Sequence, residues 1–335
     1  MDKRVIFAVA GSGKTTTIVS NLSLNKRSLI ITYTENNYNN IFNKVIKKFN
    51  GKWPESVTLM TYFTFLYRFC FKPYLSDKIK AKGLSFDKNK ETYLTQNKLF
   101  YYMSRARYLY SNRLALLLEK MNIIQELKCR IARYFDEFII DEVQDIAGRD
   151  FNFIELLMDT NINMLFVGDF YQHLYDSSRD GNVNGNLFDD MVKYEKRFLD
   201  KGFIVDHTTL QKSYRCGESV CRFIRENLGI QIFSQKLNDT SAITFVSEAE
   251  YIDKILNDDK IIKLHYQNSS KHGSGHKNWG DTKGEDHYQD VCVMLNKTTA
   301  ASYFRNKLYT LPTATKNKLY VAMTRAKGNV YLINE

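Results

Sequence analysis

The sequence has few residues of the kinds that interrupt, cross-link or anchor a chain. Its 335 residues include three prolines and five scattered cysteines, and no two cysteines form a CxxC pair. The scarcity of proline and the lack of low-complexity tracts argue against long disordered linkers. The cysteine spacing indicates neither a zinc motif nor a disulfide framework. No apolar run reaches the roughly 18–20 residues that span a bilayer, and residues 1–14 run into a glycine-rich loop without a cleavage site. We therefore expect a cytoplasmic protein that has no membrane partner.

Positive charge is abundant and concentrated in one segment. The formal net charge is +11, and residues 68–133 hold 15 Lys or Arg residues against five Asp or Glu residues. The same segment is rich in tyrosine and phenylalanine. A groove for nucleic acid needs cations for the phosphates and aromatic faces for the bases, so this composition favours nucleic-acid contact. A solvated helical surface is the alternative interpretation.

Residues 5–22, VIFAVAGSGKTTTIVSNL, have the pattern of a strand, a glycine-rich turn and a helix. They match the phosphate-binding loop pattern GxxxxGK[ST], except that Ala8 replaces the first glycine. In such a loop the backbone N–H groups and the helix N-terminus bind phosphates. We expect Lys14 to bind the β- and γ-phosphates of ATP and Thr15 to ligate Mg²⁺. The residues predicted to bind the nucleotide here are Ala10, Gly11, Ser12, Gly13, Lys14, Thr15 and Thr16.

A second apolar run, in residues 138–145 (FIIDEVQD), ends in carboxylates. Adjacent carboxylates repel each other unless a positive charge lies close by, and a metal-bound nucleotide supplies one. We expect Asp141 to hold Mg²⁺ and Glu142 to polarise the water that attacks the γ-phosphate. A solvated helix cap is the alternative, and it fits poorly after several apolar residues.

Eight motifs in order resemble those of the UvrD/Rep-type superfamily 1 DNA helicases, in a minimal form that lacks the large insertion of the second motor domain. The resemblance covers nearly the whole chain. The motifs are AGSGKTT (10–16), ITYTENN (31–37), LMTYFTFLYRF (59–69), DEVQD (141–145), FVGDFYQHLYD (166–176), LQKSYRC (210–216), TKGEDHYQDVCVML (282–295) and KLYVAMTRAK (318–327).

The resemblance implies an α/β fold with two RecA-like P-loop NTPase domains, parallel sheets and a small helical insertion. The first, ATP-binding domain is expected at 1–65 and 131–195, the basic helical insertion at 66–130, and the second domain at 196–335. Strands are expected near 4–9, 28–33, 57–60, 138–142 and 164–168 in the first domain. In the second domain they are expected within 203–210, 242–247, 259–266, 290–295 and 329–334. Residues 265–281, with His272 and His276, read as a polar surface loop, and a metal site is the less favoured alternative.

The resemblance also implies roles for individual residues. Gln172 would sense the γ-phosphate, and Arg215 and Arg325 would reach the nucleotide from the second domain, where a guanidinium accelerates phosphoryl transfer. With Lys14 and Glu142 they form the predicted catalytic set. Gly284 and Glu285 are expected at the nucleotide as well. The residues predicted to contact DNA are Thr32, Tyr33, Thr34, Thr61, Tyr62, Phe63, Tyr171 and Tyr175.

The function that the resemblance implies is ATP-dependent 3′→5′ movement along single-stranded DNA together with strand separation, and the expected partner is single-stranded DNA or tailed duplex DNA. The alternative is a regulatory NTPase subunit that controls a partner nuclease or repair complex and unwinds little by itself. It is suggested by the roughly 65 residues between Cys216 and Thr282, which leave no room for the family's extra domain. A passive binding module would leave Gln172 and both arginines without a role. The sequence leaves open the biological pathway, the choice between DNA and RNA, and the nucleotide base.

Overall fold

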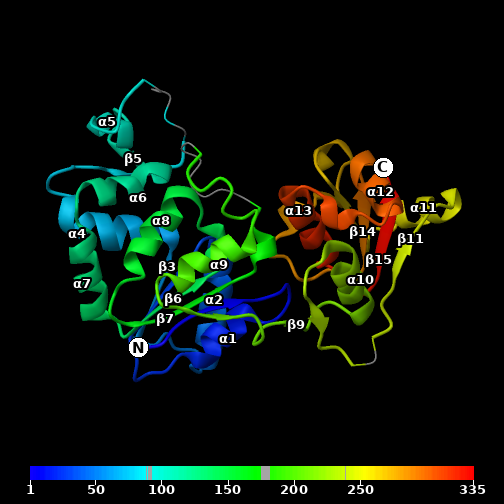
Figure 1. Ribbon diagram of the computed structural model, residues 1–335, viewed down its shortest axis with the longest axis horizontal. Coiled ribbons are helices and arrows are strands. Elements are labelled where there is room, and N and C mark those ends of the chain that lie inside the picture. Colours follow the sequence, from blue (N-terminus) through cyan, green and yellow to red (C-terminus); the bar gives the residue numbers. More distant parts are fainter. Residues whose placement is uncertain (88, 90–92, 175–181, 238) are drawn as a thin grey trace. The chain divides into compact units, whose positions relative to one another are not determined.

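The computed structural model describes residues 1–87, 89, 93–174, 182–237 and 239–335. Contacts divide the chain into two compact units. Unit 1 comprises Met1–Val5, Thr15–Val167 and Tyr175–Val205, and unit 2 comprises Ile6–Lys14, Gly168–Leu174 and Asp206–Glu335. Each unit is built on a parallel sheet with helices around it (Figure 1), which confirms the predicted α/β fold with RecA-like domains. Among the described residues, no helix has the length and apolar character needed to cross a bilayer.

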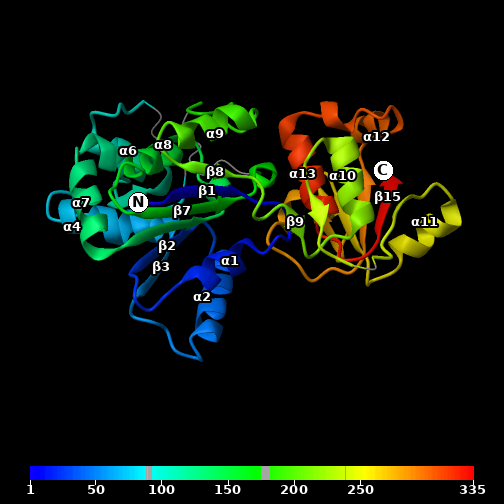
Figure 2. The same cartoon turned by 60° about the horizontal axis from the view of Figure 1, so that its bottom comes forward.

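The larger sheet has six strands in the order β3-β2-β6-β7-β1-β8. The strands are β1 (Lys3–Phe7), β2 (Ser28–Thr32), β3 (Val57–Thr61), β6 (Glu137–Asp141), β7 (Asn163–Gly168) and β8 (Ile204–Asp206). The pairs β2–β3, β2–β6 and β6–β7 are parallel. Strand β2 is buried along its whole length, as expected for a parallel sheet that is covered on both faces. Figure 2 shows helices α1 (Lys14–Asn21) and α2 (Glu35–Lys48) on one side of this sheet, and α8 (Gly148–Leu157) and α9 (Met191–Leu199) on the other.

The segment between β3 and β6 is largely helical, as predicted. Its elements are α3 (Tyr62–Thr64), the π-helix Phe65–Phe71, α4 (Lys72–Leu75), β4 (Gly83–Ser85), α5 (Leu99–Tyr102), β5 (Tyr108–Tyr110), α6 (Ser111–Lys120) and α7 (Ile124–Tyr134). The parallel β4–β5 pair, in which Leu84 lies opposite Leu109, was not predicted. Strands of three residues are too short to show an alternation of apolar and polar side chains.

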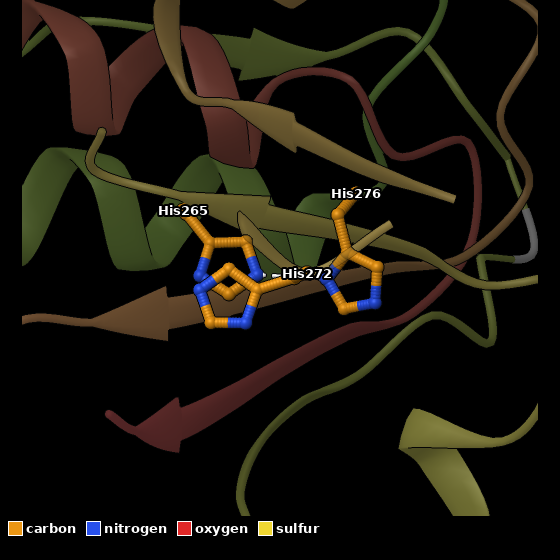
Figure 3. Close-up of side chains that lie close together, drawn as sticks. All are labelled: His265, His272 and His276. Atoms are coloured by element: carbon orange, nitrogen blue, oxygen red, sulfur yellow. Dashed lines mark hydrogen bonds between the residues drawn. The ribbon is translucent and has the colours of Figure 1, made fainter. Parts of the chain in front are cut away.

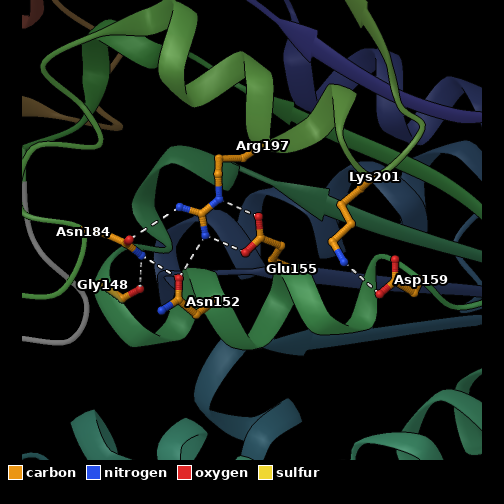
Figure 4. A network of polar contacts seen from close by, with 7 residues as sticks. All are labelled: Gly148, Asn152, Glu155, Asp159, Asn184, Arg197 and Lys201. Atoms are coloured by element: carbon orange, nitrogen blue, oxygen red, sulfur yellow. Dashed lines mark hydrogen bonds and ion pairs between the residues drawn. The ribbon is translucent and has the colours of Figure 1, made fainter.

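Arg197 of α9 ties that helix to α8 (Figure 4). Its guanidinium donates two hydrogen bonds to the Glu155 carboxylate, both of 2.5 Å, and one of 3.1 Å to Asn152 Oδ1. The Asn184 side-chain amide donates to Gly148 O at 2.8 Å, which links the chain before α9 to the start of α8. The two-pronged geometry is one that arginine makes with carboxylates and lysine does not. This network therefore fixes the helical layer that covers one face of the sheet.

The second sheet has five strands in the order β11-β15-β14-β12-β13, and each adjacent pair is parallel. Side chains alternate along β14: Val291, Val293 and Leu295 join the main apolar cluster of unit 2, while Cys292 and Met294 join a smaller cluster on the opposite face. The elements of this sheet and its surroundings are β11 (Ile243–Phe245), α11 (Ala249–Leu256), β12 (Ile262–His265), β13 (His276–Asn278), β14 (Val291–Leu295), α12 (Lys297–Phe304), α13 (Thr313–Met323) and β15 (Val330–Asn334).

Smaller elements complete the two units. A two-stranded parallel pair joins β9 (Lys212–Ser213) to β10 (Phe233–Ser234), on either side of α10 (Glu218–Leu228). The 3-10 helices are Val143–Asp145, Phe170–Gln172, Ser269–Lys271, Gly280–Thr282 and Leu308–Thr310.

Two predictions about the second sheet are wrong, although the other expected strands are confirmed. The strand predicted within 203–210 forms as β8, but β8 is the edge strand of the six-stranded sheet beside β1. The polar loop predicted at 265–281 contains strand β13, whose sequence is HKN. Because β13 is an edge strand that pairs with β12 alone, it buries no apolar face, and hydrophobic periodicity does not mark it.

Candidate nucleotide and nucleic-acid site

The glycine-rich loop connects β1 to α1 as predicted. Gly11 and Gly13 have φ angles of +70° and +87°, a left-handed conformation that favours glycine. Lys14 is the first residue of α1 and is buried. Ser12 is also buried, and its Oγ has no hydrogen-bond partner among the described residues. A buried hydroxyl without a partner is unfavourable unless a ligand fills the gap, so the loop fits a phosphate group.

Two oxygen-bearing side chains meet where β6 ends in unit 1. The Thr15 hydroxyl donates a 3.1 Å hydrogen bond to Asp141 Oδ2. Asp141 is the last residue of β6 and is almost fully buried. A hydroxyl and a carboxylate are the hard oxygen ligands that Mg²⁺ prefers, so this predicted pair fits the metal. Thr16, in contrast, is exposed, and its hydroxyl accepts a 2.9 Å hydrogen bond from the Lys44 ammonium.

Glu142 directly follows Asp141 in a strained backbone conformation, with φ of +58°. Such strain in a non-glycine residue often accompanies a functional site. Its carboxylate accepts a 2.6 Å hydrogen bond from the side-chain amide of Gln144, which is fully buried. Gln144 thus holds the carboxylate that the sequence predicts as the base. The sequence predictions include no role for Gln144, and its only signal is its place in the motif DEVQD.

A buried tyrosine binds the glycine-rich loop within unit 2. The Ala10 backbone N–H donates to the Tyr320 hydroxyl at 2.9 Å, and that hydroxyl donates to Asp169 Oδ2 at 3.0 Å. Tyr320 is fully buried. Burial, with a smaller contribution from the negative charge of Asp169, raises the pKa of its hydroxyl well above the ordinary value. The amide of Ala10 therefore serves this contact rather than a phosphate. Sequence reasoning missed Tyr320, whose only signal is its place in the motif KLYVAMTRAK.

Arg215 packs directly on the glycine-rich loop. A methyl group on Gly11 would lie 2.6 Å from Arg215 Cβ, so only glycine permits this approach. The neighbouring Tyr214 N–H donates to Gly11 O at 2.9 Å. The Arg215 guanidinium donates to Thr324 O at 3.1 Å and the side chain is half-buried. Arg215 thus lies beside one of the residues predicted to bind phosphate.

Arg325 is buried and connects α13 to the turn that follows β13 by hydrogen bonds. Its guanidinium donates to the backbone oxygens of Val321 at 3.0 Å, Glu285 at 2.9 Å and Thr282 at 3.3 Å. Burial, with a smaller contribution from the Arg215 charge, lowers its pKa to about 10, so it stays protonated at neutral pH. To contact a nucleotide as predicted, the Arg325 guanidinium has to give up some of these hydrogen bonds to backbone oxygens for hydrogen bonds to phosphate oxygens.

The 283–285 turn connects the other predicted nucleotide residues of unit 2. The Lys283 ammonium donates to Gln172 O at 2.8 Å, and Gln172 is itself buried. Gly284 has φ of +86°, which allows the turn. Burial raises the pKa of Glu285, but hydrogen bonds from Lys277 and Tyr288 outweigh that effect and lower it. The ionised Glu285 carboxylate has lone pairs left to accept a ribose hydroxyl.

An aromatic group in unit 1 contains several of the residues predicted to contact DNA. Tyr33 lies 5.7 Å from Phe63 between ring centroids, and Phe63 lies 5.2 Å edge-on from Phe86. Tyr33 and Phe63 are half-buried, whereas Phe86 is 70 % exposed. Phe86 was not predicted from the sequence because it lies outside the motifs. These rings offer faces on which bases can stack.

The other residues predicted to contact DNA differ in accessibility: Thr34 is exposed, whereas Thr32, Thr61 and Tyr62 are buried. Thr32 and Tyr62 are fully buried, so neither side chain presents a surface to DNA in this structure. Thr34 caps α2 by accepting from Asn37 N–H at 3.2 Å, and Thr61 Oγ1 donates to Thr64 Oγ1 at 2.9 Å. Tyr171 packs edge-on against Tyr320 with centroids 6.1 Å apart in unit 2. Tyr175 lies outside the described residues.

The predicted basic insertion uses part of its charge internally. Arg113 stacks on the Tyr101 ring at 3.7 Å and also donates to Tyr101 O at 2.7 Å. Arg130 lies over the rings of Phe69 and Tyr134. The segment still presents exposed aromatic side chains, namely Phe86, Tyr93, Phe100 and Tyr108. Some of the aromatic side chains on which the prediction of nucleic-acid contact depends are therefore accessible.

The structure is an α/β fold with two parallel-sheet units, consistent with two RecA-like domains, and a glycine-rich loop connects β1 to α1. Among solved structures, the chain is similar to the arterivirus nonstructural protein 10, a helicase, in its complex with DNA, with a TM-score of 0.52 and 15 % identity over 99 % of this chain and 60 % of that one. A structure of the same helicase described without DNA has the same TM-score and identity, and 59 % of it is covered. This chain therefore spans about 60 % of the length of those proteins. The sequence matches no family model and no curated protein. At this identity the likeness establishes the fold alone.

Proposed function

We propose that this chain is an ATP hydrolase that moves 3′→5′ along single-stranded DNA and separates the strands of tailed duplex DNA. The observation that carries the proposal is the hydrogen bond between Thr15 and Asp141. Thr15 directly follows Lys14 of the glycine-rich loop, and Asp141 is the last residue of β6. That pair is suited to the metal of a metal–nucleotide complex. The helicase fold of the arterivirus neighbours supports the same class of activity.

The side chains divide the chemistry among them. Lys14 and the loop amides that follow Ala10 bind the phosphates, and Thr15 and Asp141 would hold Mg²⁺, which would neutralise negative charge on the phosphates. Glu142, held by the Gln144 amide, accepts the proton of the attacking water. Arg215 and Arg325 stabilise the charge of the transition state, and Gln172 senses the γ-phosphate. Gly284 and Glu285 bind the nucleotide at its ribose.

DNA is held by aromatic faces and by cations. Tyr33, Phe63 and Phe86 stack on bases in this proposal, and the 68–133 segment contacts phosphates. Stacking of a base on an aromatic side chain contributes roughly 1–3 kcal/mol, which is enough to hold a strand that must also be released. Because phosphate contacts release counterions, binding should weaken steeply with salt.

The proposal is tested by the rate of ATP hydrolysis with single-stranded DNA, duplex DNA and RNA at two salt concentrations. We expect strong stimulation by single-stranded DNA, and a loss of about 10³-fold or more in the rate for Lys14→Ala and Glu142→Gln. Lys47→Ala is a matched control, because Lys47 is an exposed lysine of α2. A folded protein that binds ATP but hydrolyses it at a rate indifferent to nucleic acid would contradict the motor proposal.

A second candidate is a regulatory NTPase subunit that controls a partner nuclease or repair complex. It is favoured by the region between Cys216 and Thr282, whose described residues form elements of the second unit and no further domain. A tailed-duplex unwinding assay separates the two candidates. Vigorous unwinding by the isolated chain excludes the regulatory role, and DNA-stimulated hydrolysis without unwinding favours it.

A further inference from the structure

Three histidines that take no part in the proposed reaction come together at the edge of the five-stranded sheet (Figure 3). His265 is the last residue of β12, His276 is the first of β13, and His272 follows the 3-10 helix between them. One nitrogen from each ring lies within 4.8 Å of the others. The rings of His265 and His272 stack with centroids 4.1 Å apart. The β12–β13 pairing, which the sequence did not predict, brings these residues together.

A carboxylate orients the buried member of the group. His265 is 2 % exposed, and its Nδ1 lies 2.9 Å from Glu335 Oε1. A carboxylate in this place favours the tautomer with the proton on Nδ1, which leaves a lone pair on Nε2. Histidines that bind metals usually have such a carboxylate or carbonyl on their other nitrogen. Glu335 thus acts on His265 as an outer partner does in a metal site.

The lone pair of His265 Nε2 faces a second imidazole nitrogen. His265 Nε2 and His276 Nδ1 are 2.8 Å apart. Two nitrogens at this distance share a proton or a cation, because two lone pairs would repel. Two imidazole nitrogens bound tetrahedrally to Zn²⁺ are roughly 3.3 Å apart, from Zn–N distances of about 2.0–2.1 Å. A small ring movement therefore opens the pair for a metal, and the exposed His272 can turn its ring toward it.

We propose that His265, His272 and His276 bind one transition-metal ion, with Zn²⁺ as the ion of choice and water in the fourth position. Three neutral imidazoles without a thiolate suit Zn²⁺ and other imidazole-preferring ions, and they are poor ligands for Mg²⁺. The site is therefore chemically distinct from the Thr15–Asp141 pair. The Glu335 carboxylate lies beside the proposed site and offsets part of the ion's charge. The buried Lys263 opposes binding, although its ammonium is engaged with Asp258 O at 2.7 Å.

The ion's role follows from where the ligands are attached. It fastens the end of β12 and the 266–275 segment to the short edge strand β13. The next residue, Lys277, forms an ion pair of 2.5 Å with Glu285. A metal here stabilises the strand that supports this ion pair. This consequence does not require the proposed ATP hydrolysis.

The experiment uses the full chain, stripped of metal with a chelator and transferred to chelator-free buffer. It is titrated with ZnCl₂ and with CoCl₂, whose visible absorption reports tetrahedral nitrogen ligation, while MgCl₂ serves as the control ion. We expect one Zn²⁺ per chain after gel filtration and a rise in Tm with Zn²⁺ but not with Mg²⁺. His272→Ala should weaken Zn²⁺ binding about 100-fold, because it removes a ligand. Glu335→Gln should weaken it about 10-fold, because it removes the outer partner.

His207→Ala is the matched control, since His207 is an exposed histidine elsewhere in unit 2. It should bind Zn²⁺ like the unchanged protein. Circular dichroism confirms that each variant is folded, and His276→Gln gives a second ligand variant should His272→Ala fail to fold. Zn²⁺ binding that is absent, or that is equally strong in the folded ligand variants, overturns the proposal. Neither result affects the test of ATP hydrolysis, which is carried out with Mg²⁺.

Discussion

The most informative stability variant is Tyr320→Phe, which removes one oxygen atom from the buried contact with the glycine-rich loop. In the structure that hydroxyl accepts from Ala10 N–H at 2.9 Å and donates to Asp169 at 3.0 Å. The change keeps the ring and its packing, so it isolates the polar contact. It deprives a fully buried backbone N–H of its acceptor and Asp169 of one donor.

The size of the effect follows from these two losses. A buried donor without an acceptor costs about 1–3 kcal/mol, and a hydrogen bond to a charged group contributes about 1.5–3 kcal/mol. Asp169 keeps the Tyr171 N–H at 3.2 Å, which recovers part of the loss. We therefore expect the free energy of unfolding to fall by about 2–4 kcal/mol.

The assay uses the two tryptophans of the chain, Trp53 in unit 1 and the fully buried Trp279 in unit 2. In a Trp53→Phe background, Trp279 fluorescence reports urea unfolding of unit 2. Tyr309→Phe is the control. Because Tyr309 is 55 % exposed, this substitution should change the midpoint of urea unfolding little. If Tyr320→Phe lowers the free energy of unfolding no more than this control, the buried contact does not stabilise the loop.

Three further predictions concern other parts of the molecule. Arg197→Lys should lower the free energy of unfolding of unit 1 by about 1–3 kcal/mol, because lysine cannot form both hydrogen bonds to Glu155. Trp53 fluorescence measures the change, and an unchanged unfolding midpoint would contradict it. Burial raises the pKa of Asp206, but hydrogen bonds from Thr209 and Thr208 outweigh this effect and lower the pKa to about 2. The ionised Asp206 therefore stabilises the fold above pH 3.8, and this contribution is lost as the pH falls toward 2. Asp206→Asn should cost about 1 kcal/mol at pH 7 and flatten the pH dependence of stability between pH 4 and 2, and an unaltered profile would exclude the effect. Phe86→Ala should weaken single-stranded DNA binding about 10-fold with little change in ATP binding, and equal affinity in a fluorescence-anisotropy titration would remove Phe86 from the DNA surface.

The sequence predicted the strands of the six-stranded sheet well because each strand that leads to the site is a short apolar run followed by a break. FIID and NMLFVG belong to this kind, and both form strands in the predicted places. The edge strands β8 and β13 were assigned to the wrong sheet or missed. The three polar residues of β13 carry no apolar pattern on which a prediction could depend, and for β8 the local pattern predicted the strand but not the sheet that it joins.

The candidate site was predictable where local spacing determines it. The turn at Gly11 and Gly13 and the carboxylates at the end of β6 follow from residues adjacent in the chain. The contact of Tyr320 with Ala10 joins residues 310 positions apart, and no local pattern encodes it. The three histidines likewise needed the β12–β13 pairing, which places His265 beside the start of β13. The parts of the site that the sequence did not predict therefore depend on contacts between residues far apart in the chain.

The central claim is our proposal that Lys14, Thr15, Asp141 and Glu142 each contribute to ATP hydrolysis that responds to nucleic acid. The most direct measurement is the ATP hydrolysis rate of the unchanged chain and of Glu142→Gln, each with and without single-stranded DNA. The account predicts a rate that rises strongly with DNA in the unchanged chain, and a rate near background in Glu142→Gln, which still binds ATP. Hydrolysis that persists in folded Glu142→Gln, or that ignores DNA in the unchanged chain, would contradict it.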